Sequence, residues 1–187
     1  MADPLSVLSP DIRSQIDSLA SEHAPRSIFA YGSATRANDN LIASDLELGV
    51  IAHLGATLSR RKLAETVTVP RVRVYVFDEQ SLRRASPRVP FNARLFVYEL
   101  AITARTVFGA PVAETLPVPQ VRALDLYGEL RFNVGRCVQA LMASRSGADA
   151  LAADGFAKSV LYGARAWLVF EQRRFPESFA AVARLAR

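Results

Sequence analysis

Short apolar runs and strict alternation mark the first part of the chain as strand-forming. Residues 26–31 and 45–52 are apolar runs, and residues 71–77 alternate valine with arginine or an aromatic residue. Because successive side chains of a strand point to opposite faces, this alternation predicts a strand with one buried face. A further short strand is predicted over residues 106–109.

Apolar residues at helical spacing lie between and around these strands. The spacing predicts helices over residues 10–23, 56–66 and 91–103. Ser9 followed by Pro10 is typical of a helix start, with Ser9 as the N-cap.

A segment with three prolines, residues 111–119, is followed only by helical patterns. Long helices are predicted over residues 120–143 and 148–173, and a third helix begins near residue 175. Their apolar residues are expected to form the core of a helix bundle. In the first long helix these residues are Leu124, Tyr127, Leu130, Val134, Val138 and Leu141.

The change from period two to period 3.6 predicts two domains of different class. Residues 1–110 would form an α+β domain with a mixed β-sheet and helices on one side. Residues 111–119 would be a linker, and residues 120–187 a small all-helical bundle domain.

A Gly-Ser pair and two carboxylates stand at the ends of successive apolar runs. Gly32 and Ser33 end the first run, and Asp45 and Glu47 open the second. Residues i and i+2 of a strand share a face, and two adjacent carboxylates repel each other unless a cation lies between them. Mg²⁺ fits such oxygen ligands and usually accompanies a phosphate-bearing molecule. Gly32 would permit the close approach of such a phosphate-bearing molecule, while the Ser33 hydroxyl and the Arg36 guanidinium would bind its phosphate oxygens.

The simpler interpretation of these residues is a turn followed by an edge strand with two solvated acids. The spaced pattern, however, resembles the nucleotidyltransferase superfamily related to DNA polymerase β. Here it consists of Tyr31-Gly32-Ser33, an eleven-residue spacer and Asp45-Leu46-Glu47-Leu48. The resemblance covers roughly residues 9–110, and the later helices resemble, more distantly, the helical domain that follows many small members of this superfamily.

The resemblance implies transfer of a nucleoside monophosphate from a nucleoside triphosphate to an acceptor hydroxyl on a small molecule, a protein or RNA. Asp45 and Glu47 would be the catalytic residues and the Mg²⁺ ligands. Gly32, Ser33 and Arg36 would bind the nucleotide.

Active members of the superfamily usually carry a third carboxylate on a later strand. The corresponding strand here carries Arg71 and Arg73 and has no acid in its middle. Asp78 and Glu99 are the alternatives for the missing group. A catalytically degenerate nucleotide-binding or antitoxin-like interaction module therefore stays open beside the enzyme.

Composition narrows the class of protein without identifying a partner. The chain has 187 residues, half of them apolar, and a net charge of +5, which suits an anionic partner or a solvated basic surface. Its one cysteine, Cys137, excludes an internal disulfide. No signal segment or membrane-spanning run is visible, so a cytoplasmic protein without membrane contact is expected. The acceptor, a partner protein and a homodimer are left open.

Overall fold

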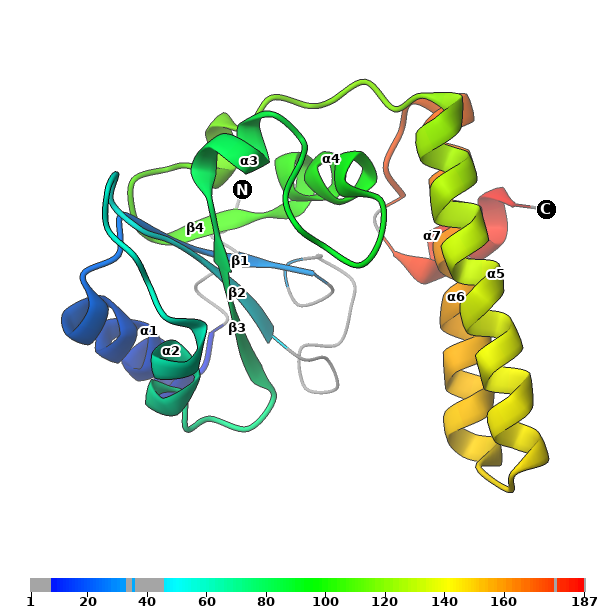
Figure 1. The fold of residues 1–187 in the computed structure, drawn as a ribbon, viewed down its shortest axis with the longest axis horizontal. Helices are drawn as coiled ribbons and strands as arrows, with labels where there is room; N and C mark the ends of the chain where they lie inside the picture. Colours follow the sequence, from blue (N-terminus) through cyan, green and yellow to red (C-terminus); the bar gives the residue numbers. More distant parts are fainter. Residues whose placement is uncertain (1–7, 33–34, 36–45, 177, 187) are drawn as a thin grey trace. The chain divides into compact units, whose positions relative to one another are not determined.

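The computed structural model describes residues 8–32, 35, 46–176 and 178–186 (Figure 1). The chain divides into two compact units. The sheet unit comprises Met1–Pro87 and Glu99–Val118, and the helical unit comprises Arg88–Tyr98 and Pro119–Arg187. Residues 88–98, which the sequence pattern assigns to the first domain, thus group with the helical unit.

A four-stranded mixed sheet forms the centre of the sheet unit, in the order β3-β2-β1-β4 (Figure 1). Its strands are β1 (Ser27–Tyr31), β2 (Leu46–Ile51), β3 (Val72–Phe77) and β4 (Arg105–Gly109). Strand β1 pairs antiparallel with both β2 and β4, while β2 and β3 are parallel. The predicted strands and the α+β class with a mixed sheet are therefore confirmed.

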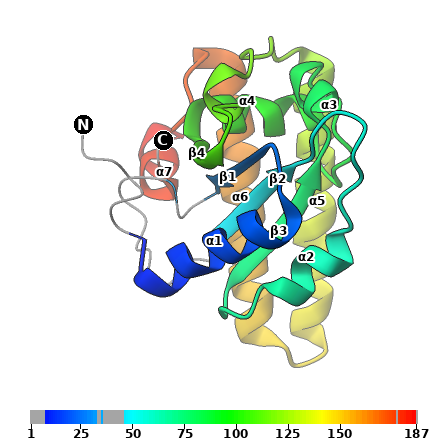
Figure 2. The same cartoon turned by 90° about the vertical axis from the view of Figure 1, so that its left-hand side faces the viewer.

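Two helices cover one face of this sheet, α1 (Pro10–His23) and α2 (Arg60–Thr66) (Figure 2). The predicted cap of α1 is present, because the Ser9 side chain accepts a hydrogen bond from the backbone N–H of Ile12. The core beneath the helices consists of apolar side chains at alternate strand positions. It contains Ile16 and Leu19 of α1, Leu63 of α2, and Ile28, Ala30, Leu46, Leu48, Val50 and Val74 of the sheet.

The opposite face of the sheet is aromatic. The rings of Phe29, Tyr31 and Phe77 lie within 6.0 Å of one another, centroid to centroid. Short helix α3 (Glu79–Arg83) follows β3. Helix α4 (Ala93–Thr103) begins in the helical unit, and its second half, from Glu99, belongs to the sheet unit. That half of α4 lies on the side of the sheet away from α1 and α2 (Figures 1 and 2). The prediction of helices on one side is therefore wrong. The second face carries the aromatic rings, and these also need cover from water.

The segment after β4 packs closely onto the sheet unit. It contains the short 3₁₀ helix η3 (Ala113–Thr115), and Val112, Ala113 and Leu116 are buried. Glu114 accepts hydrogen bonds of 2.6 Å from both the backbone N–H and the hydroxyl of Thr106. The predicted linker thus contributes core residues to the sheet unit.

The helical unit consists of α5 (Ala123–Arg145) and α6 (Asp149–Gln172), which form a long antiparallel hairpin, and α7 (Phe179–Leu185). In the described residues after Val118 every regular element is a helix, as predicted. Tyr98, from the first half of α4, packs with Val121, Val169 and Phe175 in the core of this unit.

The expected bundle core of α5 is not buried. Leu124, Tyr127, Val134, Val138 and Leu141 are all at least 51% exposed. A polar row at positions i, i+4 and i+8 is buried instead, and it consists of Asp125, Glu129 and Asn133. The prediction failed because a helical pattern shows which residues share a face but not which face another helix covers.

The buried carboxylates of α5 hold the start of α4. Glu129 accepts a hydrogen bond of 3.0 Å from the backbone N–H of Asn92. The Asn92 side-chain oxygen in turn accepts from the N–H groups of Arg94 and Leu95 in the first turn of α4. Negative charge at a helix N-terminus is stabilising because the N–H dipoles point toward it.

Candidate functional site

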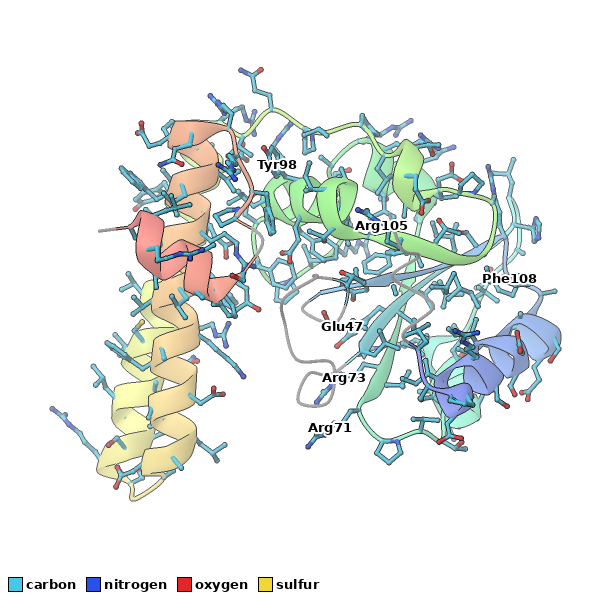
Figure 3. All side chains as sticks on the ribbon, turned by 180° about the vertical axis from the view of Figure 1, so that it is seen from behind. Glu47, Arg71, Arg73, Tyr98, Arg105 and Phe108 are labelled. Atoms are coloured by element: carbon cyan, nitrogen blue, oxygen red, sulfur yellow. The ribbon has the colours of Figure 1, made fainter. Side chains whose placement is uncertain are left out.

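Strand pairing places three polar side chains in one row across the sheet. Tyr31 of β1 stands opposite Glu47 of β2, and Glu47 is in register with Arg73 of β3. Paired residues share a face, so all three project from the aromatic side of the sheet. Figure 3 shows Glu47 and Arg73 projecting from the same end of their strands, with Arg71 beside them.

Gly32 lies directly against the Glu47 carboxylate. Its φ of +82° is in the left-handed region, and a Cβ built on it would stand 2.7 Å from Glu47 Oε2. Any other residue would be strained in this turn and would push the carboxylate away. The lack of a side chain at Gly32 therefore leaves room for the partly buried carboxylate of Glu47 at the end of β1, and we call this space the cradle.

A second carboxylate lies near the same tyrosine. The pKa of the Tyr31 hydroxyl is raised far above its usual value, mainly by burial and next by the negative charge of Glu47. Tyr75 and Glu99 raise this pKa further, while Arg60 opposes them. Glu47 of β2 and Glu99 of α4 thus both act on one buried, protonated hydroxyl.

Of the predicted site residues, Gly32 and Glu47 are described and are brought together. Ser33, Arg36 and Asp45 lie outside the described residues, so their roles stay predictions. Where the chain is described, no three acidic, histidine or cysteine side chains form a group that could hold a metal ion.

The two alternatives for the third carboxylate differ in position. Asp78 follows the far end of β3, five residues beyond Arg73, or roughly 16 Å along an extended strand. It caps α3, accepting hydrogen bonds of 2.7 Å from the backbone N–H and the hydroxyl of Ser81, which lower its pKa. Asp78 is therefore too far from Glu47 to share a ligand with it, whereas Glu99 acts on the same tyrosine.

The two arginines of the predicted carboxylate strand are both exposed. Arg71 adopts a positive φ of 67°, and its carbonyl accepts a hydrogen bond of 2.9 Å from the backbone N–H of Leu46. This bond fixes the start of β2 against β3 and so sets the register that brings Arg73 beside Glu47.

Sequence reasoning missed Tyr31 as a site residue. The signal was available, because Tyr31 precedes the Gly-Ser turn and Glu47 opens the next strand, so antiparallel pairing would oppose them. The position of Glu99 had no local signal, since it depends on how α4 packs.

Comparison of the sequence with protein-family models gives no match, and comparison with curated proteins gives none either. Among the helices that the structure describes, none combines the length and the apolar character needed to cross a membrane.

Proposed function

We propose that this chain is a Mg²⁺-dependent nucleotidyltransferase that moves a nucleoside monophosphate from a nucleoside triphosphate to an acceptor hydroxyl. The observation that carries the proposal is the cradle that Gly32 leaves for the Glu47 carboxylate where β1 ends and β2 begins. A glycine turn beside an acidic strand start is what a site for phosphates and a divalent cation requires.

We assign a hard divalent cation to the carboxylates at this end of the sheet. Glu47 would supply the carboxylate beside Gly32, Glu99 lies near the same hydroxyl, and Asp45 is the second ligand that the sequence motif assigns. When bound, Mg²⁺ would neutralise phosphate charge and lower the pKa of the acceptor hydroxyl.

The chain's own residues would position the reacting groups. Ser33 and Arg36 are assigned to the triphosphate, and the open backbone at Gly32 allows its oxygens to approach. The acceptor oxygen would form a bond to the α-phosphorus while the bond to the leaving pyrophosphate breaks, with the acceptor proton passing to solvent or a carboxylate. Tyr31, held neutral by its raised pKa, can donate a hydrogen bond at this end of the sheet.

A specific observation favours a second candidate, a nucleotide-binding module without transfer. Arg73 is in register with Glu47 on the strand where active members of the superfamily carry an acid. A guanidinium beside a carboxylate competes with a metal ion for its oxygens.

Titration calorimetry with Mg²⁺ and a non-hydrolysable triphosphate analogue tests the site. We expect the unaltered chain to bind and Glu47→Gln to lose at least about tenfold in affinity, equivalent to about 1.4 kcal/mol. Gly32→Ala should lose a similar amount, because its Cβ displaces the carboxylate. Glu65→Gln, an exposed glutamate on α2, is the matched control and should bind like the unaltered chain. Equal binding by Glu47→Gln and Glu65→Gln would refute the site.

Pyrophosphate release from each of the four nucleoside triphosphates separates the two candidates. Release that depends on Mg²⁺ and disappears in Glu47→Gln supports the transferase. Binding without release, together with tighter Mg²⁺ binding in Arg73→Ala, supports the binding module.

A further inference from the structure

The hairpin of α5 and α6 is joined by small side chains. A Cβ built on Gly155 would lie 3.8 Å from the Cβ of Ala140, and one on Gly163 would lie 3.5 Å from Leu130 Cδ2. Ser159 is fully buried between these glycines, and its hydroxyl donates to the carbonyl of Gly155. Because the two helices meet mainly through such residues, several of their large apolar side chains stay exposed.

Those large side chains form one continuous stripe, which we call the open face. It consists of Val134 and Leu141 of α5 and Phe156, Val160 and Trp167 of α6. At 100° per residue, Leu141 and Val134 lie about 65–85° around α5 from the mean direction of Leu130, Asn133 and Ala140, which meet α6. Phe156, Val160 and Trp167 lie about 60–100° around α6, and the antiparallel arrangement puts both stripes on the same side of the hairpin.

The other side of the hairpin is already covered by its own chain. The rings of Tyr162 on α6 and Phe179 on α7 lie 5.2 Å apart, edge to face. The Arg165 guanidinium lies over the rings of Phe175 and Phe179, at 5.0 and 4.5 Å from their centroids. Tyr162 and Arg165 lie on the side of α6 opposite Val160, so α7 leaves the open face uncovered.

We propose that the open face binds the open face of a second copy of this chain, forming a four-helix bundle across a two-fold axis. The two helices of the hairpin have nearly equal lengths, 23 and 24 residues. An antiparallel pair of matched length is complementary to its own copy when turned by 180°.

The exposed area matches such an interface. The five side chains are between 41% exposed, for Phe156, and 63% exposed, for Val134. Together they present on the order of 500 Å², close to the apolar share of the roughly 800 Å² that each partner buries in a standard interface.

The positions of the charged residues on α6 favour a second copy of the chain as the partner. Lys158 and Arg165 are the charged residues of α6 between Phe156 and Trp167, and both lie on the far side of that helix. Between Phe156 and Trp167, the α6 half of the stripe therefore offers no cation to nucleic acid or to an anionic membrane surface. It also presents no like charges that would repel a second copy. On α5, the exposed Arg131 and Arg145 lie at the two ends of the stripe, outside Val134 and Leu141.

The mass of the 187-residue chain in solution tests the proposal, and it can be measured by size-exclusion chromatography with light scattering. We expect twice the 20.4 kDa of one chain at high concentration. Leu141→Glu and Val160→Glu should elute as monomers, because each would bury an unpaired charge in the dimer. Leu151→Glu is the matched control, since Leu151 is 79% exposed on α6 but lies outside the open face, and it should stay dimeric.

Trp167 gives a second measurement that needs no variant. It is the one tryptophan of the chain, and it lies in the open face. Its emission should shift to longer wavelength on dilution, as the dimer dissociates and water reaches the ring. A chain that stays monomeric with constant Trp167 emission would overturn the proposal. The proposal would also be overturned if Leu151→Glu dissociated as fully as Leu141→Glu and Val160→Glu. A monomer whose Trp167 emission shifts only when anionic vesicles are added would overturn it too.

Discussion

The sheet unit and the α5–α6 hairpin bury different kinds of side chain. In the sheet unit the fully buried residues are large and apolar, such as Phe29 and Leu48. Where α5 and α6 meet, the buried residues are small or polar, such as Ser159 and Asn133, while Val134 and Trp167 face outward.

This difference shows that the two units are stabilised in different ways. Removal of large apolar side chains from water stabilises the sheet unit within a single chain. The hairpin depends instead on close helix contact and on the hydrogen-bonded carboxylates of α5. The large apolar side chains of the open face would be buried only when two chains associate. The two units should therefore respond differently to the same kind of substitution.

Leucine truncation should show the largest contrast. We expect Leu48→Ala to lower the free energy of unfolding of the sheet unit by about 2–5 kcal/mol, because it leaves a cavity in the core. Leu141→Ala should change the stability of the dilute, monomeric helical unit by less than about 0.5 kcal/mol. Hydrogen exchange followed by mass spectrometry resolves peptides of the two units. Equal losses for both variants at low concentration would contradict the comparison.

Glycine-to-alanine substitution should have opposite signs in the two units. A Cβ on Gly49 would lie 2.1 Å from the Phe29 ring, so Gly49→Ala should destabilise the sheet unit by about 1–3 kcal/mol. Gly155→Ala has ordinary space and a helical backbone, so it should stabilise the hairpin by about 0.5–1 kcal/mol.

Gly135→Ala is the control for the helix, because nothing lies within 4 Å of its added Cβ. Urea unfolding should show similar gains for Gly155→Ala and Gly135→Ala. A loss in Gly155→Ala alone would mean that the helices approach more closely than described.

Asp125 of α5 should contribute to the acid sensitivity of the helical unit. Burial raises the pKa of Asp125, but hydrogen bonds from the Arg122 side chain and backbone N–H and from Asn92 outweigh it and lower this pKa. The stabilisation is therefore present above the unfolded value of about 3.9 and is lost as the pH falls through the lower folded value. Asp125→Asn should lower the free energy of unfolding by about 1–2 kcal/mol at neutral pH. It should also reduce the loss of stability as the pH falls. Thermal unfolding of both proteins between pH 2 and 7 measures the effect, and parallel curves would contradict it.

Much of the sheet was predictable because its signals are local. The alternation before Phe77 and the Ser9-Pro10 start depend on neighbours a few residues apart, and both are confirmed. The parallel pairing of β2 with β3 has no such signal, because it depends on which strand edges meet after a long crossover.

The site could be predicted only in part for the same reason. The meeting of Gly32 with Glu47 follows from the motif, and the structure has it. Glu99 is brought near Tyr31 by a helix more than fifty residues later in the chain. The buried row beginning at Asp125 looks like a solvated face in the sequence, since its cover comes from Asn92 on another segment.

Helix α4 belongs to both units, and this restricts how the chain could have been assembled in evolution. Tyr98 donates a hydrogen bond of 2.9 Å to the carbonyl of Arg173 and packs on Phe175, although it precedes Glu99 of the sheet unit by one residue. A recombination event joining a different C-terminal region at residue 119 would remove these partners and expose an apolar half-helix. An exchange of the C-terminal region that kept the fold would therefore have to preserve the partners of Tyr98.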